Sequence, residues 1–300
     1  MGLNKKGFFF TGIVIVIFSL FFLSYTLYSS IQERKAIQQR VATMNNFIYS
    51  IEQDLQRQLF IAGFRSIFIL ENQITSSGEY IADSDEHFQS IFFNGTFLNQ
   101  SQELMLGATY QNIILSSQEK AASLNIDMNF SSPLYEVTQE DPWNVKFTLS
   151  LNLKAEDKAG LASWNKTENV IALVPIEYFE DPIYYIGTGG EFSLKFKKTP
   201  YTFSPGDTTN LSLHAQDMYY AASLLAPSFL DRLQGITTEN PQGIESFVNL
   251  LTTGYSAPQE SSVIDYQLFY LSTSGCYVQG TPSWFRIDPA HLTLYNATCS

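Results

Sequence analysis

The stretch KKGFFFTGIVIVIFSLFFLSY, residues 5–25, decides how the rest of this 300-residue chain is interpreted. It opens a run from residue 8 to residue 28, 21 residues long, with no charged residue and no proline. At 1.5 Å per residue a helix of this length spans about 30 Å, the thickness of the hydrocarbon layer of a bilayer. The run is therefore predicted to be a transmembrane helix.

The charges on either side of the run predict its orientation. Lys5, Lys6 and the α-amino group precede it, whereas the charges of Glu33, Arg34 and Lys35 nearly cancel after it. Because basic residues stay in the cytoplasm, we expect a single-pass protein of the cell membrane, with a cytoplasmic N-terminus and extracellular C-terminal domains. A cleaved secretory signal is the alternative, but the run is long for one and offers no small-x-small cleavage site at its end.

The helical pattern continues beyond the predicted membrane span. We predict one helix from about residue 8 to about residue 72. Its outer part carries an apolar stripe that needs a cover, either in a coiled coil or on the protein's own sheet. We favour the sheet, because Gly63 interrupts the stripe after about four heptads. The stripe recurs at steps of three and four residues and consists of Ile37, Val41, Met44, Ile48, Ile51, Leu55, Leu59 and Ala62.

These N-terminal features together resemble a type IV pilin-like precursor of archaea and bacteria, over about residues 1–70. They are a short basic leader ending in KKG, a phenylalanine directly after it, and an apolar helix with an amphipathic extension. The resemblance implies that a prepilin peptidase cuts after Gly7 and leaves Phe8 as the new N-terminus. One position departs from the bacterial pattern: Gly12 stands where bacterial pilins carry a glutamate that pairs with a neighbouring subunit, although many archaeal relatives lack that acid.

The middle of the chain predicts a partner for the long helix. Residues 84–123 are expected to form one or two helices, after which the apolar period changes to two in residues 124–130 and in WNVKFTLSLNLK, residues 143–154. Residues 169–179 form a more apolar strand, which Pro175 places at an edge or a bulge. The fold class is therefore α+β, with an antiparallel meander packed on the helix.

A second, mostly-β outer unit is expected in the last third of the chain. The predicted domains are a leader at 1–7, the transmembrane helix at 8–28, a helix-plus-sheet unit at 29–182, and a β-rich unit at 183–300. Helical pieces are expected there at about 214–234 and 242–252. The short strands expected in this unit are 191–197, 264–271, 283–288 and 291–296.

Two features agree with an extracellular location. The two cysteines, Cys276 and Cys299, are expected to form a disulfide, with two buried thiols as the alternative. The Asn-x-Ser/Thr pattern for glycosylation occurs more often than the roughly three matches expected by chance. Its positions are Asn94, Asn99, Asn129, Asn165, Asn210 and Asn296.

Motifs for catalysis are largely missing from the sequence. His87, His214 and His291 are far apart, and no nucleophile elbow, P-loop or dinucleotide pattern occurs. Clustered acids are usually solvated turn residues, although a glycosidase site or a calcium loop remains open, with residues 83–86 (DSDE) the best calcium candidate. We expect no enzyme, catalytic residue, metal or cofactor. The clustered acids are Asp83, Asp85, Glu86, Glu140, Asp141, Glu180 and Asp181.

The predicted function is that of a membrane-anchored, outward-facing pilin-like surface protein with a structural, filament-assembly or adhesion role. Its expected partners are the bilayer, a prepilin peptidase, and copies of itself or a pilus-type assembly machinery. Nucleic acid is excluded, because 29 acidic against 17 basic residues leave a formal charge of −12. The alternatives are a single-pass anchored cell-surface binding module, acting as a receptor or binding carbohydrate, and, less favoured, an ectodomain hydrolase.

Overall fold

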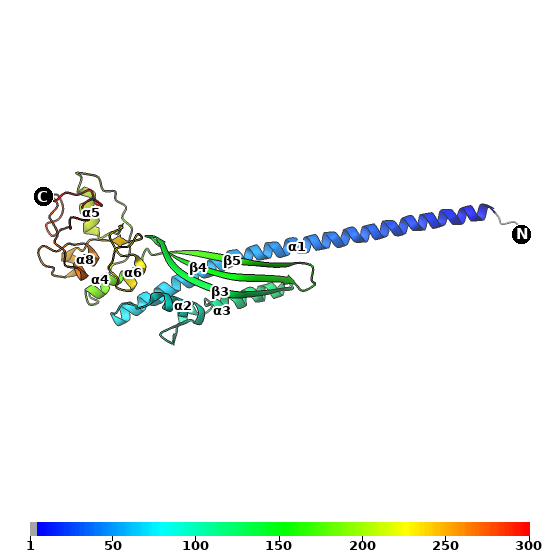
Figure 1. The fold of residues 1–300 in the computed structure, drawn as a ribbon, viewed down its shortest axis with the longest axis horizontal. Coiled ribbons are helices and arrows are strands. Elements are labelled where there is room, and N and C mark those ends of the chain that lie inside the picture. Colours follow the sequence, from blue (N-terminus) through cyan, green and yellow to red (C-terminus); the bar gives the residue numbers. More distant parts are fainter. Residues whose placement is uncertain (1–4) are drawn as a thin grey trace.

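Helix α1 is the longest element of the protein. The computed structural model describes residues 5–300, and α1 runs unbroken over Lys5–Ser77, 73 residues. Its N-terminal part stands clear of all other labelled elements, whereas its C-terminal part lies along the sheet and the shorter helices (Figure 1). The prediction that the apolar run and the amphipathic stripe form one helix is confirmed.

Three long strands form one antiparallel sheet in the order β3-β4-β5. They are β3 (Ile126–Asp141), β4 (Asn144–Asp157) and β5 (Ser163–Pro175). In β4 every second residue from Val145 onward is buried, as the alternation predicts. The edge strand β5 ends at Pro175, a position where a missing N–H costs no ladder bond. The predicted meander is therefore confirmed.

The buried face of the sheet covers the predicted stripe of α1 from Met44 onward. Ile37 lies before the covered part and is 40 % exposed. Gly63 does not interrupt the packing, because a Cβ placed there would lie 2.6 Å from the ring of Phe147 on β4. The missing side chain thus allows the helix and the central strand to approach closely.

Two further helices pack on the remaining sheet surface, as predicted for residues 84–123. Helix α2 (Ser84–Asn94) buries Phe88 and Phe92, and the Phe92 ring stacks on Tyr135 of β3 at 4.2 Å between centroids. Helix α3 (Tyr110–Ser123) lies along β3. Between them are the short hairpin β1 (Thr96–Phe97) and β2 (Gln100–Ser101), and the 3₁₀ turn η1 (Glu103–Met105).

The last third of the chain differs from the expected β-rich unit. In the described chain its only paired strands are two residues each, β6 (Ala221–Ala222) and β7 (Ile244–Glu245), and the other contacts between extended segments are isolated bridges. Figure 1 shows this region as short helices joined by loops at the end of the molecule opposite the N-terminus. The helices are α4 (Pro182–Gly187), α5 (Thr209–Asp217), α6 (Phe229–Leu233), α7 (Leu250–Thr253) and α8 (Asp265–Tyr270).

The expected strand at 264–271 is instead helix α8. Its first residue, Asp265, is buried, and its carboxylate accepts hydrogen bonds from the backbone of Tyr266 (2.7 Å) and Ser246 (3.1 Å). A short apolar run fits both periods, so long-range contacts of this kind decide its conformation. The expected strands at 283–288 and 291–296 are also reduced, the first to one bridge at Ile287 and the second to turns.

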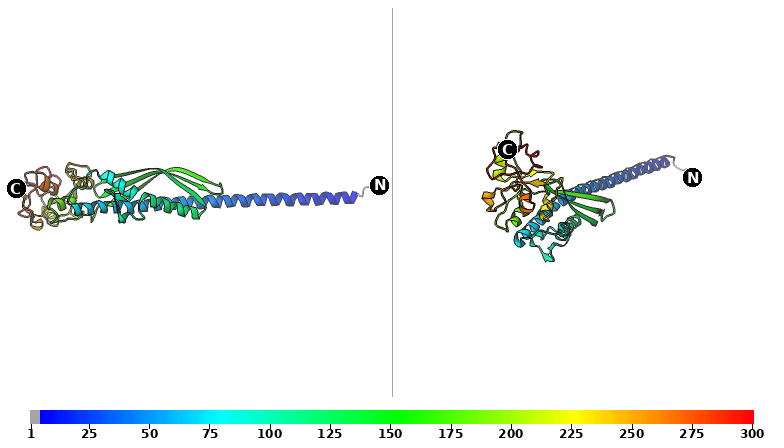
Figure 2. Two further views of the ribbon diagram at one scale, coloured as in Figure 1. Left: turned by 90° about the horizontal axis from the view of Figure 1, so that it is seen from below. Right: turned by 60° about the vertical axis from the view of Figure 1, so that its left-hand side comes forward.

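The core continues across the predicted boundary at residue 182. Phe229, Leu233, Ile244 and Val248 belong to the same apolar cluster as the sheet and α1. A second cluster around Phe247, Phe285 and Tyr295 fills the outer part of the C-terminal region. Figure 2 shows the C-terminal region lying beside the distal part of α1 in both views.

Candidate functional site

The uncovered apolar segment of α1 is the first candidate site. Every side chain from Phe9 to Tyr28 is exposed, and Phe21 is 73 % exposed. An apolar surface of this size would be unfavourable in water, at about 25 cal/mol per Å². By length and composition the helix is able to cross a membrane, and none of its apolar window is buried by the rest of the protein.

The polar groups of this segment suit an apolar surrounding. The hydroxyl of Ser19 donates to the Ile15 carbonyl at 2.8 Å, and that of Thr26 donates to the Leu23 carbonyl at 2.9 Å. Both hydroxyls are therefore satisfied within the helix. Gly12 leaves open space where a side chain would lie, within a shallow hollow formed with neighbouring apolar residues. Small residues of this kind let another helix approach closely.

An ion pair joins α1 to the end of the sheet that lies nearest the apolar segment. Arg40 pairs with Asp157 at the end of β4 and also donates to the carbonyls of Leu124 (2.6 Å) and Asn125 (3.2 Å). The hydrogen bond from Arg40 lowers the pKa of Asp157 below its usual value. Further along the helix, Glu52 accepts a hydrogen bond from Lys166 of β5. These contacts hold α1 and the sheet in one register.

The predicted processing site lies at the beginning of α1. The backbone of Gly7 and Phe8 is part of the helix. Residues 1–4 of the predicted leader lie outside the described residues. Cleavage after Gly7 stays a prediction.

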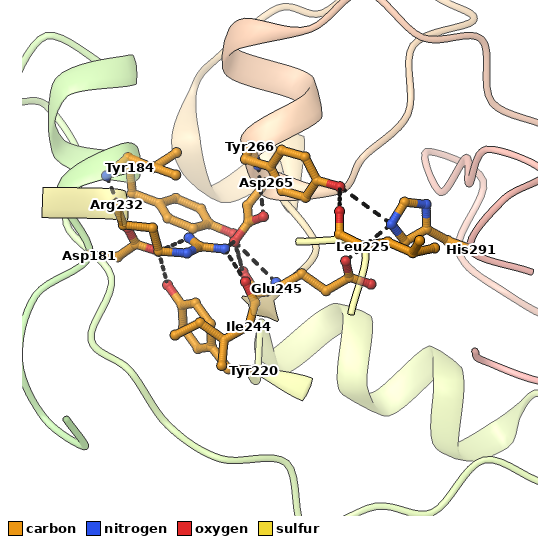
Figure 3. Close-up of polar contacts among 12 residues, drawn as sticks. Asp181, Tyr184, Tyr220, Leu225, Arg232, Ile244, Glu245, Asp265, Tyr266 and His291 are labelled. Atoms are coloured by element: carbon orange, nitrogen blue, oxygen red, sulfur yellow. Dashed lines mark hydrogen bonds and ion pairs between the residues drawn. The ribbon is translucent and has the colours of Figure 1, made fainter. Parts of the chain in front are cut away.

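The C-terminal region holds a buried charge network centred on Arg232 of α6, drawn in Figure 3. The guanidinium is fully buried and pairs with Asp181, which precedes α4, and with Asp265 of α8 at 3.0 Å. It also donates to the Ile244 carbonyl in β7, and the Tyr220 hydroxyl donates to Asp181 at 2.8 Å. Burial raises the pKa of Asp265, although the Arg232 charge opposes that shift. The network therefore joins four short elements.

A second part of this network surrounds His291. Its Nδ1 lies 2.7 Å from Asp288 and its Nε2 lies 3.2 Å from Glu245, which also accepts from the Tyr295 hydroxyl at 2.8 Å. Burial lowers the pKa of His291, but the two carboxylates outweigh burial and raise it to about 10. At neutral pH the imidazole is therefore charged and paired on both sides, which suits a structural ion bridge better than proton transfer.

The other two histidines, His214 and His87, lie in separate parts of the structure. His214 is buried among Phe203, Phe247 and Tyr295, and burial lowers its pKa to about 3. His87 lies against Phe97 at 4.7 Å between ring centroids.

The clustered acids have structural positions. Asp83 precedes α2, while Asp85 and Glu86 occupy its first turn, where carboxylates complement the helix dipole. Asp141 accepts from the backbone of Trp143 in the β3-β4 turn, and Glu140 pairs with Lys146. Within residues 5–300, no group of three or more histidine, cysteine or acidic residues is arranged to hold a metal ion.

The asparagines of the glycosylation pattern lie at or near the surface. Asn129 on β3 and Asn165 on β5 stand in one row on the solvent face of the sheet, with Lys154 between them. Asn94 ends α2, Asn99 lies in the β1-β2 turn, Asn210 is half-buried in α5, and Asn296 is exposed near the C-terminus. Glycosylation of all six stays a prediction.

The predicted disulfide is present between Cys276 and Cys299, with Cα atoms 5.6 Å apart. The backbone of Cys276 forms an isolated antiparallel β-bridge with Ile287, and that of Cys299 forms one with Val278. The bond thus ties the end of the chain to the outer core, and it is consistent with an oxidising compartment.

The Arg232 network was not predicted from the sequence. Its members come from positions 181, 220, 232, 244 and 265, so no local spacing reveals them. The one available signal is an arginine on the short apolar helix of APSFLDRLQG, residues 226–235.

Comparisons of the chain with protein-family models, curated proteins and solved structures found no match. The resemblance to type IV pilin-like precursors therefore remains a prediction from the N-terminal residues.

Proposed function

We propose that this chain is a membrane-anchored, outward-facing pilin-like surface protein whose apolar helix segment is its assembly element. The observation that carries the proposal is the continuity of α1, which joins an uncovered apolar half to a half packed under the protein's own sheet. A simple anchor needs no such rigid connection. A rigid connection fits a subunit whose outer domain must keep a set position relative to neighbouring helices.

The energetics of assembly follow from the exposed side chains. In lipid, the apolar residues from Phe9 to Tyr28 gain nothing by burial against another apolar helix, since lipid tails are equally apolar. Close packing and small residues then favour association, and Gly12 and Ser19 supply two points of close approach. Because Gly12 stands in place of an acid, assembly would rest on packing rather than on a charge pair.

The outer half supports the same role. Arg40 lies 12 residues beyond residue 28, about 18 Å along the helix, and from there onward contacts with the sheet hold α1. The intervening residues 29–39 are exposed apart from a half-buried Ser29. The outer domain would therefore stand off the membrane on a short helical spacer.

N-terminal sequencing of the mature protein from membranes tests the proposal. The proposal predicts Phe8 as the first residue. Met1 would indicate an uncleaved anchor, as in a single-pass binding module, and a first residue near 30 would indicate a secreted protein; both results would overturn the pilin-like assignment.

A pair of glycine variants sharpens this test. Gly7→Leu should abolish the mobility shift of the mature protein on a gel, because prepilin peptidases need the glycine that the resemblance places here. Gly2→Leu is the matched control in the same leader and should be processed normally. Unchanged processing of the Gly7 variant would remove the peptidase step.

A further inference from the structure

A cavity of about 280 Å³ lies between the distal part of α1 and the segment that follows β5. It is separate from both sites described above. Phe64 and Phe68 of α1 and Tyr178 form apolar walls, and Glu71, Glu180 and Lys195 are among its polar lining residues. Phe64 lies 36 residues beyond residue 28, about 54 Å along the helix, so the cavity is far from any lipid around residues 8–28.

The aromatic walls are unusually accessible. Phe64 and Phe68 are 44 % and 45 % exposed, although most apolar side chains of the covered part of α1 are buried. The ring of Phe179 packs against the ring of Phe64, with 5.2 Å between the centroids. Aromatic faces of this kind carry negative electrostatic potential and attract organic cations.

Glu71 gives the cavity a hydrogen-bond acceptor that carries a negative charge when ionised. Its side chain is only 9 % exposed, and one carboxylate oxygen, Oε1, accepts a hydrogen bond from the backbone N–H of Glu180. Among the residues that the structure describes, no hydrogen bond reaches the other oxygen, Oε2, which is accessible from the cavity rather than fully buried. Burial raises the pKa of Glu71 to about 7, although the hydrogen bond from Glu180 opposes this shift. A cationic ligand in the cavity could therefore pair with this carboxylate through a charge-assisted hydrogen bond.

Most of the surrounding charged groups are also acidic. Glu177 and Glu180 also line the cavity, against one cation, Lys195. The charge of Lys195 acts on Glu71 and opposes the rise in its pKa. The cavity therefore carries a net negative charge when Glu71 is ionised, which disfavours anionic ligands.

Tyr178 lies at the rim in an unfavourable backbone conformation. Its φ is +74°, in the left-handed region that aromatic residues rarely adopt, and its side chain is 72 % exposed. Its N–H donates to the Phe196 carbonyl at 2.9 Å, which holds the main chain in place. The conformation keeps an exposed aromatic ring beside the carboxylates.

We propose that this cavity binds an alkylammonium group, with its alkyl part against Phe64, Phe68 and Tyr178 and its charge against Glu71. An alcohol of the same shape could donate a hydrogen bond to Glu71 but would bring no charge, so the charge-assisted hydrogen bond should dominate recognition. Two sources offer this chemistry: a small amine in the outer medium, or a lysine side chain of another protein. The inference does not depend on the proposed assembly role of the helix.

Isothermal titration calorimetry tests the proposal on the full chain in lipid nanodiscs at pH 8, with empty nanodiscs as the blank. Butylammonium should bind with millimolar affinity and at least about tenfold more tightly than 1-butanol, which has the same shape without the charge. Equal affinities, or the absence of saturable butylammonium binding, would overturn the proposal.

A second ligand distinguishes the two sources. Tighter binding of N-acetyl-lysine-methylamide than of butylammonium would favour a lysine side chain as the source. Tighter binding of butylammonium would favour a small amine. Both results support an alkylammonium site.

Three variants locate the binding. Glu71→Gln keeps the acceptor for the Glu180 N–H but removes the charge, and should weaken butylammonium binding about tenfold. Tyr178→Ala removes an exposed ring and should weaken binding several-fold without affecting the fold. Glu119→Gln, on the exposed face of α3, is the matched control and should leave binding unchanged. Unchanged binding in both cavity variants would sink the assignment.

Discussion

Two regions of the molecule are stabilised in different ways. One is built on α1 and the β3-β4-β5 sheet, and the other is the C-terminal region. In the first, long elements bury continuous apolar faces, such as the alternate residues of β4 against α1. In the second, the helices have four to nine residues, and a fully buried arginine, buried acids and a disulfide join them. Long regular elements satisfy their own backbone groups, whereas short ones leave groups that side chains must satisfy.

The network around Arg232 illustrates this difference. The guanidinium donates to the Ile244 carbonyl, and Asp181 accepts from the backbone of Ile183 at 2.9 Å. The ions of the C-terminal region thus replace hydrogen bonds that a sheet would provide. Buried ions are favourable only as a complete set, because one unpaired member is strongly destabilising.

Removal of Arg232 should have the largest effect. Arg232→Met leaves Asp181 and Asp265 buried without their cation, and we expect a loss of about 4 kcal/mol in the free energy of unfolding. Segment-resolved hydrogen exchange should show faster exchange at 183–300 than at 126–175. Lys154→Gln, which removes an exposed ion pair, is the control and should change little. A uniform effect along the chain would contradict the comparison.

A large-to-small substitution in the sheet region should cost somewhat less stability, and it should loosen the sheet before the C-terminal region. Leu149 of β4 is 1 % exposed, and Leu149→Ala should cost about 3 kcal/mol through lost burial and an unfilled space. Hydrogen exchange should now accelerate in β3, β4 and β5 before it does in the C-terminal region. The reverse order would show that the stability of the sheet depends on the C-terminal region.

Glu71 at the junction of the two regions should give the smallest effect, with a defined pH dependence. Its pKa is about 7 in the folded protein against 4.5 as the reference value, so the folded state holds the proton more tightly. Stability from this group is therefore greatest below pH 4.5 and is lost as pH rises through 7. Glu71→Gln should stabilise the protein by about 2 kcal/mol at pH 8 and by little at pH 4.

Denaturant unfolding at the two pH values measures this difference. Glu177, Glu180 and Lys195 line the same cavity and are unchanged in the variant. A destabilised variant at pH 8 would show that the Glu71 charge is compensated within the protein. A residue whose replacement raises the stability of the protein is typical of a binding site.

The candidate sites differ in how far the sequence reveals them. The apolar segment of α1 is visible as a run without charge or proline, because a membrane span is a property of consecutive residues. The cavity at Glu71 and the network at Arg232 are not visible, because each joins residues from distant positions. The acidic pair Glu180 and Asp181 resembled turn residues, yet the two belong to the cavity and the network respectively.

The sequence by itself determined the long helix, the meander with its dry and wet faces and the disulfide, since periodicity over ten or more residues and a single cysteine pair leave few alternatives. Tertiary structure decided the C-terminal region. There α8 replaced an expected strand, because in a run of six to eight residues local preference is weaker than the buried contacts that Asp265 makes. It also decided that Gly63 is a contact point, since only the position of Phe147 shows why no side chain fits there.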